Sequence, residues 1–455
     1  MRQVFATSTD FPTCTSAGII FLLILTCLLP CDTALAQDVG ELTPDESVRL
    51  GLAHNARLRA AEAEADEAHA AYRQVRAGRL PSVQSQASYT RLSGNIPDAE
   101  FTIPGLDTSF TVLPIELNRY HAEVSVEQPL FTGFRRRNQI RAAAREADAA
   151  ALMAQQEAAD TAFEIRRAYW TLFQAIAVRD ATTTALAQVD EHLRNVRNRL
   201  DAGAALTSDL LSAQTRRSEV RLEQVEADSD VRIAQLELNR LLGLPLDQAV
   251  TTVTDIEIET APAETDALVA RALESRPQLE ALEEQVRSLE FRVDATRGSW
   301  LPELGIVARY VYARPNPYVF AEQNEFRGTF EAGSILRWNL WEGGRNAETI
   351  QARARLEGAS ARLTDAREQV AVEVTRRVLE TRSSAEAVEV AEQHVRQAEE
   401  TLRVILRQFE EGVVLSAQVL EGEEAFRVAH ARRAQALANH AIARAALLNT
   451  FGEVW

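Results

Sequence analysis

Apolar residues recur at alternating spacings of four and three along two very long segments of this chain. The first segment, residues 136–200, contains neither proline nor glycine and predicts a helix of about 97 Å at 1.5 Å per residue. A repeat of 3.5 residues favours packing against partner helices in a left-handed supercoil. The second segment shows this spacing best between Val388 and Phe409. The predicted seam of the first helix consists of Ile140, Ala144, Ala147, Ala151, Ala154, Ala158, Ile165, Ala168, Leu172, Ala175, Leu186, Val189, Leu193, Val196 and Leu200.

A shorter helical segment follows each long one, across a turn that contains a single glycine. The two turns contain Gly203 and Gly412, and the shorter segments are residues 208–242 and 416–451. Two helices joined by so short a turn form an antiparallel hairpin. The sequence therefore predicts two long helical hairpins.

The whole order of signals occurs twice along the chain. Gly203 and Gly412 lie 209 positions apart, and so do Gly243 and Gly452, which close the two shorter helices. A single repeat of this kind rarely buries its apolar face alone, so the two copies are expected to pack together. The predicted division is a first repeat at 37–243, an equatorial linker at 244–266 and a second repeat at 267–455.

Four segments alternate apolar and polar residues in the manner of β-strands: 83–91, 120–126, 304–312 and 326–340. Such alternation over about ten residues is typical of transmembrane barrel strands. Four strands cannot close a barrel and open edges are unstable in lipid, so closure would need two, three or four copies of the chain. The loops at 93–114 and 315–325 have the polarity of extracellular loops. The aromatic residues fit either membrane-interface girdles or ordinary sheet packing, and they are Tyr89, Tyr120, Phe131, Tyr310, Tyr312, Trp338 and Trp341.

The first 36 residues predict a secretory signal peptide. An apolar run at 18–29 precedes Ala34-Leu35-Ala36, which fits a small-residue cleavage site. All three cysteines lie in this segment, so the mature chain would contain no thiol and no disulfide. Lipidation at Cys31 is the alternative. No later stretch reaches the roughly 20 apolar residues of a spanning helix, so we expect an exported protein without one.

The composition excludes several kinds of chemistry. No lysine occurs, which removes Walker-type phosphate loops, Schiff-base catalysis and Ser-Lys dyads. The net charge of −17 argues against nucleic acid as a partner, and it fits either a solvated surface or an acidic lumen. His192 and His394 have no histidine three or four positions away, and no Gly-x-Ser-x-Gly motif is present. We expect no enzyme activity, no cofactor and no metal site.

The duplicated order of strand pair, long helix, glycine turn and shorter helix resembles the TolC-type outer-membrane efflux proteins. The resemblance covers nearly the whole chain after residue 36 and is most specific at the turns, in residues 199–210 and 408–421. It implies a mainly α fold with β-structure, in which long coiled-coil helices form a periplasmic α-barrel and each protomer adds four strands to a trimeric 12-stranded transmembrane β-barrel. The tip residues that it assigns to adaptor docking are Arg199, Leu200, Gly203, Leu206, Thr207, Gly412, Leu415 and Ser416.

The resemblance also implies a function. The protein would be the outer-membrane channel of a tripartite efflux system, a passive duct for substrates that an inner-membrane pump delivers through a periplasmic adaptor. Its partners would be two further copies of itself, a membrane-fusion (adaptor) protein, the pump or secretion transporter, and outer-membrane lipid. The alternative is the outer-membrane component of a type I protein secretion system. A periplasmic coiled-coil scaffold or adhesin is a more remote alternative, because it leaves the strands unexplained.

Some members of the family close the tunnel with a tyrosine, an arginine and acidic residues near the second tip. Phe409, Val414, Gln418 and Glu421 occupy those positions here, so the hydroxyl, the guanidinium and one carboxylate are missing. The candidates for a tunnel constriction are Asp209, Phe409, Gln418 and Glu421. A ring of acidic side chains would favour cations, whereas the alternative is that Asp209 and Glu421 are simply solvated.

Overall fold

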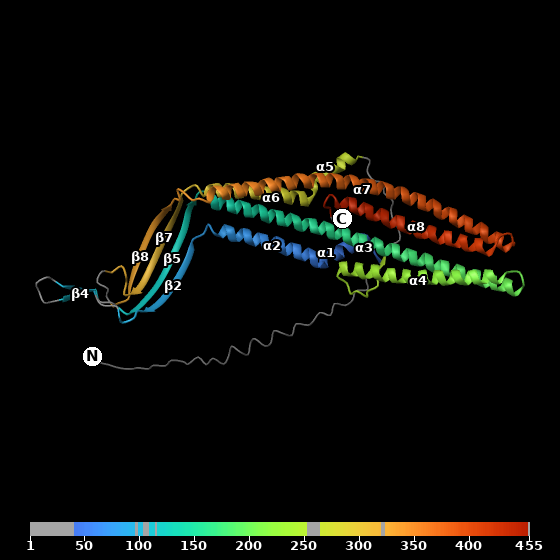
Figure 1. Ribbon diagram of the computed structural model, residues 1–455, viewed down its shortest axis with the longest axis horizontal. Helices are drawn as coiled ribbons and strands as arrows, with labels where there is room; N and C mark the ends of the chain where they lie inside the picture. Colours follow the sequence, from blue (N-terminus) through green and yellow to red (C-terminus); the bar gives the residue numbers. More distant parts are fainter. Residues whose placement is uncertain are drawn as a thin grey trace, which may run out of the picture. The chain divides into compact units, whose positions relative to one another are not determined.

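A computed structural model describes residues 41–95, 99–102, 109–113, 116–252, 264–319 and 324–453 of the chain. The predicted signal peptide and Cys31 lie outside the described residues, as does most of the predicted linker after residue 252. A four-stranded sheet and two pairs of long helices dominate the described part (Figure 1).

The sheet contains the four predicted strands. They are β2 (Ser82–Arg91), β5 (Asn118–Thr132), β7 (Glu303–Arg314) and β8 (Arg327–Arg337), in the order β2-β5-β7-β8 with every pair antiparallel. The prediction that the last strand runs on to Leu340 was wrong. β7 begins at Glu303, which pairs with Arg337, so the residues beyond Arg337 have no neighbouring strand to pair with.

The two faces of the sheet differ as the alternation predicted. On one face Val124 lies opposite Tyr310, and Tyr310 lies opposite Phe330, and all three side chains are exposed in the single chain. On the other face the Arg309 guanidinium lies 2.9 Å from a carboxylate oxygen of Glu123 and 3.0 Å from one of Glu331. One face of the sheet is thus apolar and uncovered, and the other carries charges.

A second, smaller sheet lies in the segment that was predicted to be a loop. β3 (Ala99–Thr102) and β4 (Ser109–Leu113) pair antiparallel. Strands of four and five residues are too short to produce a clear period-two signal. The predicted loop at 93–114 therefore contains a short β-hairpin, which the sequence pattern did not reveal.

The helices follow the predicted hairpins closely. Their bounds are α1 (Pro44–His54), α2 (Ala56–Ala77), α3 (Arg135–Asp201), α4 (Thr207–Leu242), α5 (Thr265–Ser275), α6 (Pro277–Gly298), α7 (Arg345–Glu410) and α8 (Ser416–Asn449). Helix α3 packs against α4 and α8, and α7 packs against α8 (Figure 1). Within the described ranges, no helix has the length and hydrophobicity required of a membrane span.

The buried stripe of α7 matches its prediction, whereas that of α3 is shifted. Val388, Ala391, Val395, Ala398, Leu402 and Phe409 are all buried on α7. On the distal part of α3, Ala185 and His192 are buried where Leu186 and Leu193 were predicted. The reason is that α3 lies between α4 and α8, so its buried face has to serve two neighbours and not a single seam.

The four strand ends that connect to helices all lie at the same end of the sheet. Glu303 pairs with both Thr132 and Arg337, and Ser82 pairs with Glu127, five residues before the end of β5. The two repeats are in tight contact at this end of the sheet. A side-chain Cβ at Gly133, which has φ +60°, would lie 2.2 Å from the carbonyl oxygen of Gly298. Only glycine permits both the backbone conformation and this contact.

Candidate functional site

The turn of each hairpin has the same backbone structure. In the first turn the Ala204 N–H donates to the Arg199 carbonyl at 2.7 Å, and in the second the Val413 N–H donates to the Gln408 carbonyl at 2.8 Å. Gly203 has φ +73° and Gly412 has φ +77°. These are Schellman ends, which require a left-handed residue. Nothing would contact a Cβ at either glycine, so the backbone conformation alone selects glycine there.

Asp209 and Gln418, two of the predicted constriction residues, are capping residues in the structure. The Asp209 Oδ2 accepts from the Leu206 N–H at 3.1 Å, and the Gln418 Oε1 accepts from the Leu415 N–H at 3.2 Å. The two sites are equivalent positions in α4 and α8, and each satisfies a backbone donor that the helix leaves unpaired. An amide and a carboxylate serve this purpose equally, which explains why the two repeats differ here.

The apex of each turn is apolar and exposed. Leu206 is 68% exposed and Leu415 is 74% exposed, and Gly203, Thr207 and Gly412 are exposed as well. Leucine side chains at such positions gain nothing from the fold of a single chain. The predicted docking residues at the apexes are therefore accessible, whereas Ser416 is buried and Arg199 and Leu200 are half-buried.

The ends of the two hairpins are held together by an apolar cluster, which we call the tip joint. It consists of Val196, Phe409 and Val419, with Leu210, Ile405 and Val414 packed around them. The Arg199 guanidinium lies 4.1 Å from the centre of the Phe409 ring and donates to the Phe409 carbonyl at 2.9 Å. Phe409, a predicted constriction residue, is thus buried between the hairpins in the described chain. A cation–π contact of this kind contributes about 0.5–2 kcal/mol.

A buried histidine adds a polar contact to the tip joint. The His192 Nε2 lies 2.8 Å from the Ser416 Oγ, and the imidazole ring is 5.3 Å from that of Phe409. Burial lowers the pKa of His192, the Arg199 charge lowers it further, and Asp209 partly opposes the shift. The imidazole is therefore neutral at neutral pH. This contact could not be predicted from the sequence because its partners lie on different repeats and no local pattern relates them.

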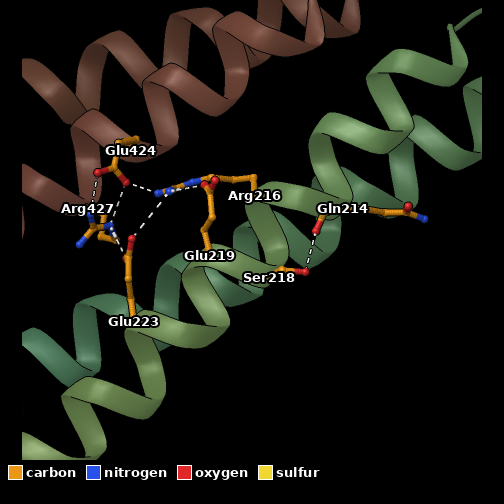
Figure 2. Close-up of polar contacts among 7 residues, drawn as sticks. All are labelled: Gln214, Arg216, Ser218, Glu219, Glu223, Glu424 and Arg427. Carbon is orange, nitrogen blue, oxygen red and sulfur yellow. Dashed lines mark hydrogen bonds and ion pairs between the residues drawn. The ribbon is translucent and has the colours of Figure 1, made fainter.

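A cluster of charges further along the helices links α4 to α8. Figure 2 shows Arg216 and Glu223 of α4 facing Glu424 and Arg427 of α8. Arg216 pairs with Glu424, and the Arg427 Nε lies 2.9 Å from Glu424 and 3.3 Å from Glu223. Burial alone would raise the pKa of Glu424, but the bonds and charges of Arg427 and Arg216 outweigh it and lower the pKa. Glu219 extends the cluster, 3.3 Å from Arg216.

Glu423 lies close to this cluster and is buried. Its side chain is 4% exposed, and among the described residues its Oε2 has no hydrogen-bond partner. Burial raises the pKa of Glu423 to about 7, although the charge of Arg216 opposes the shift. Glu421, which was predicted as a constriction residue, is exposed on the same helix. A buried carboxyl in an otherwise solvated helix cannot be recognised from spacing alone.

The chain combines an antiparallel sheet that has one uncovered apolar face with two helices of more than 60 residues, each packed against a shorter helix. This is the architecture of a TolC-like channel subunit. The chain belongs to the outer membrane efflux protein family, whose model matches residues 48–244 and 268–453. Membership of this family places the protein in the outer membrane.

Similar proteins have both efflux and secretion names. The Brucella suis outer membrane efflux protein BepC is 26% identical over 185 residues, which are 41% of this chain and 40% of the relative. The Dickeya chrysanthemi proteases secretion protein PrtF is 24% identical over 415 residues, or 88% of this chain and 86% of the relative. The Pseudomonas aeruginosa alkaline protease secretion protein AprF matches over 53% of its length. The chain thus spans about half or less of BepC and AprF.

Solved structures share the fold over nearly the whole chain. CusC gives a TM-score of 0.76 at 16% identity and covers 92% of this chain and 95% of its own. The Vibrio cholerae outer membrane protein VceC gives 0.74 at 19% identity and covers 90% and 96%. The prediction of a TolC-like fold is confirmed.

Proposed function

We propose that three copies of this chain form an outer-membrane channel that acts as the passive exit duct of a tripartite efflux system. An inner-membrane pump would load the duct through a periplasmic adaptor that contacts the hairpin tips. The observation that carries the proposal is the pairing, in one chain, of a sheet suited to lipid on one face with helical hairpins that end in exposed apolar turns. No covalent chemistry is involved.

The edges of the sheet support assembly. Among the described strands, β2 and β8 each pair on one side only. The strands alternate in direction, so β2 and β8 run oppositely, and β8 of one copy can pair antiparallel with β2 of the next. Unpaired backbone groups are costly in lipid, which drives this closure. Three copies give a barrel of twelve strands, within the range of outer-membrane barrels.

The outer helices of the hairpins carry matching apolar stripes. On α4 the side chains of Leu222, Val225 and Ile233 are exposed, and on α7 those of Val372, Leu379 and Val390 are exposed. α4 and α7 lie at the two ends of the helix order α4-α3-α8-α7. Exposed stripes at both ends of a helical layer support packing of α4 against α7 of a neighbouring copy.

The two-repeat organisation is part of the proposal. It consists of a first repeat at 37–243, an equatorial linker at 244–266 and a second repeat at 267–455. Two separate matches to the family model support this division. β1 (Glu41–Leu42) pairs parallel with β6 (Thr251–Thr252), which ties the start of the first repeat to the linker.

Protein secretion is the second candidate function. Two relatives are named as secretion proteins, and PrtF matches over most of this chain. BepC and the Alcaligenes xylosoxydans nickel-cobalt-cadmium resistance protein NccC support efflux instead. Both functions need the same duct and differ in the pump. A coiled-coil scaffold is disfavoured because it would not need the sheet.

The test begins with the full chain purified from outer membranes in detergent. We expect an unboiled species of three times the chain mass and, in planar bilayers, discrete conductance steps. Charged substitutions in the stripe, Leu222→Asp with Val225→Asp, should abolish both, whereas the same change at the exposed Val413 of the second turn should leave them intact. A protein that stays monomeric and dissolves without detergent would contradict the proposal.

A further inference from the structure

A groove lined by residues of both repeats lies where the sheet gives way to the helices. It has a volume of about 330 Å³ and lies between the first turns of α3 and the end of α6. Its charged lining is Arg137, Arg141, Arg297 and Asp294, and its apolar lining includes Phe134 and Leu301. Asp294 pairs with Arg297 at 3.1 Å, so the groove keeps two net positive charges from Arg137 and Arg141.

The two remaining arginines have no carboxylate to neutralise them among the described residues. Arg137 is exposed and makes no ion pair there, and Arg141 contacts only the ring of Phe291, at 5.5 Å. Both lie in the first two turns of α3, whose first turn contains no acidic residue. Cations at a helix N-terminus oppose the helix dipole and are unfavourable there without a nearby anion. The local charge thus suits an anion from outside the chain.

The second repeat shows that the arrangement is not required by the fold. Its long helix α7 has Ala347 and Gln351 at the positions of Arg137 and Arg141, and Glu348 in its first turn. Arg345, which corresponds to Arg135, is buried and lies 3.1 Å from Glu342. The start of α7 is therefore electrically balanced within the chain, and the start of α3 is not.

The groove continues the lipid-facing side of the sheet. Phe131 lies opposite Leu304, on the face that carries Tyr310 and Phe330, and its ring contacts that of Phe134 edge-on at 5.3 Å. Phe134 has φ +63°, a strained backbone for a side chain of this size, and is exposed. The structure thus places an aromatic side chain in an unfavourable conformation beside the unpaired arginines and next to the apolar face.

We propose that this groove binds an anionic phospholipid of the membrane leaflet nearest the helices. The guanidinium groups of Arg137 and Arg141 hold the phosphate, which arginine can bind through two hydrogen bonds at once. The acyl chains lie along Phe134 and Leu301 towards Phe131. Helix α3 starts at Arg135 and rises about 1.5 Å per residue, so the two arginines lie about 3 and 9 Å along the helix, on either side of the roughly 5–8 Å that a headgroup layer occupies. The inference rests on the outer-membrane location and not on the cargo of the duct.

The test compares phosphatidylglycerol with phosphatidylcholine, each added to the assembled channel in detergent and counted by native mass spectrometry. We expect the wild type to bind phosphatidylglycerol at least about tenfold more tightly, because the choline cation of phosphatidylcholine offsets the charge of the phosphate that the two arginines bind. Arg137→Gln with Arg141→Gln should reduce this preference to about twofold or less, and the lysine pair at the same positions should retain part of it. Arg353→Gln with Arg362→Gln removes the same charge from exposed sites on α7 and should change nothing.

Two results would overturn the proposal. One is an unchanged lipid preference in the Arg137/Arg141 glutamine variant, whose assembly is verified by its migration without boiling. The other is full displacement of phosphatidylglycerol by inorganic phosphate, which would make the groove a simple anion site without a role for the acyl chains. A wild-type channel that keeps the preference but does not conduct would contradict the proposed function and leave the lipid site intact.

Discussion

The His192 Nε2 lies 2.8 Å from the Ser416 Oγ, at the point where the two helical hairpins of one chain meet. The two residues belong to different repeats, on α3 and at the start of α8. With Arg199 bonded to the Phe409 carbonyl, this contact fastens the hairpin ends to each other within the chain. In the proposed trimer, the tips would therefore move more easily between chains than within one chain.

Acid should weaken the tip joint through His192. Its pKa is lowered in the folded chain, chiefly by burial, while an unfolded histidine binds a proton near pH 6.5. The contribution of the neutral imidazole to stability is therefore full above about pH 6.5 and is lost as the pH falls below it. His192→Gln should remove this part of the acid dependence. Thermal unfolding measured between about pH 8 and pH 5 checks the prediction, and an equal slope in variant and wild type would contradict it.

Glu423 should make the folded state less stable at high pH, which is opposite to the effect of His192. Its pKa is raised by burial to about 7, against 4.5 for the free side chain. The protonated carboxyl thus favours the folded state below about pH 4.5, and this contribution is lost as the pH rises through 7. Glu423→Gln keeps the shape and removes the charge, so it should stabilise the protein at pH 8 by on the order of 3 kcal/mol.

The matched control for Glu423 is Glu421→Gln on the same helix. Glu421 is exposed, so the same substitution should leave the midpoint of thermal unfolding unchanged at every pH. Equal stabilisation by the two substitutions would show that net charge, and not the burial of Glu423, is responsible.

The pair formed by Arg216 and Glu424 should couple α4 to α8. The Arg216 side chain is mostly buried and also contacts Glu219 and Glu223. A double-mutant cycle with alanine at both positions should give a coupling energy of roughly 1 kcal/mol or more. The solvent-exposed pair Arg240–Glu237 within α4 is the control and should give a coupling near zero. Similar coupling energies in the two cycles would contradict the prediction that this pair couples α4 to α8.

Elements with long periodic patterns could be predicted from the sequence, whereas the contacts between repeats could not. The bounds of α3 were found to within a few residues because its pattern runs over many turns. The hairpin β3–β4 was missed because its strands are too short to show a period. Glu423 was missed because its burial depends on which side of α8 meets the first hairpin. That relation is set by packing, and no local pattern encodes it.

The glycines at the hairpin turns should separate docking from membrane assembly. Proline cannot adopt the φ of +73° at Gly203 or +77° at Gly412, so Gly203→Pro with Gly412→Pro should disrupt both turns. Alanine can adopt this conformation at a cost of roughly 1–2 kcal/mol and meets no neighbouring atom, so the alanine pair should retain most activity.

The sheet lies at the other end of α3 and α7 from these turns, so it should assemble normally in both variants. Accumulation of an exported dye in cells measures transport, and migration of unboiled protein measures assembly. We expect the proline pair to abolish export and keep the assembled species. Because Leu206 and Leu415 at the apexes are mostly exposed, the loss would locate the adaptor contact at the turns. Full export by the proline pair would instead exclude the turns from docking.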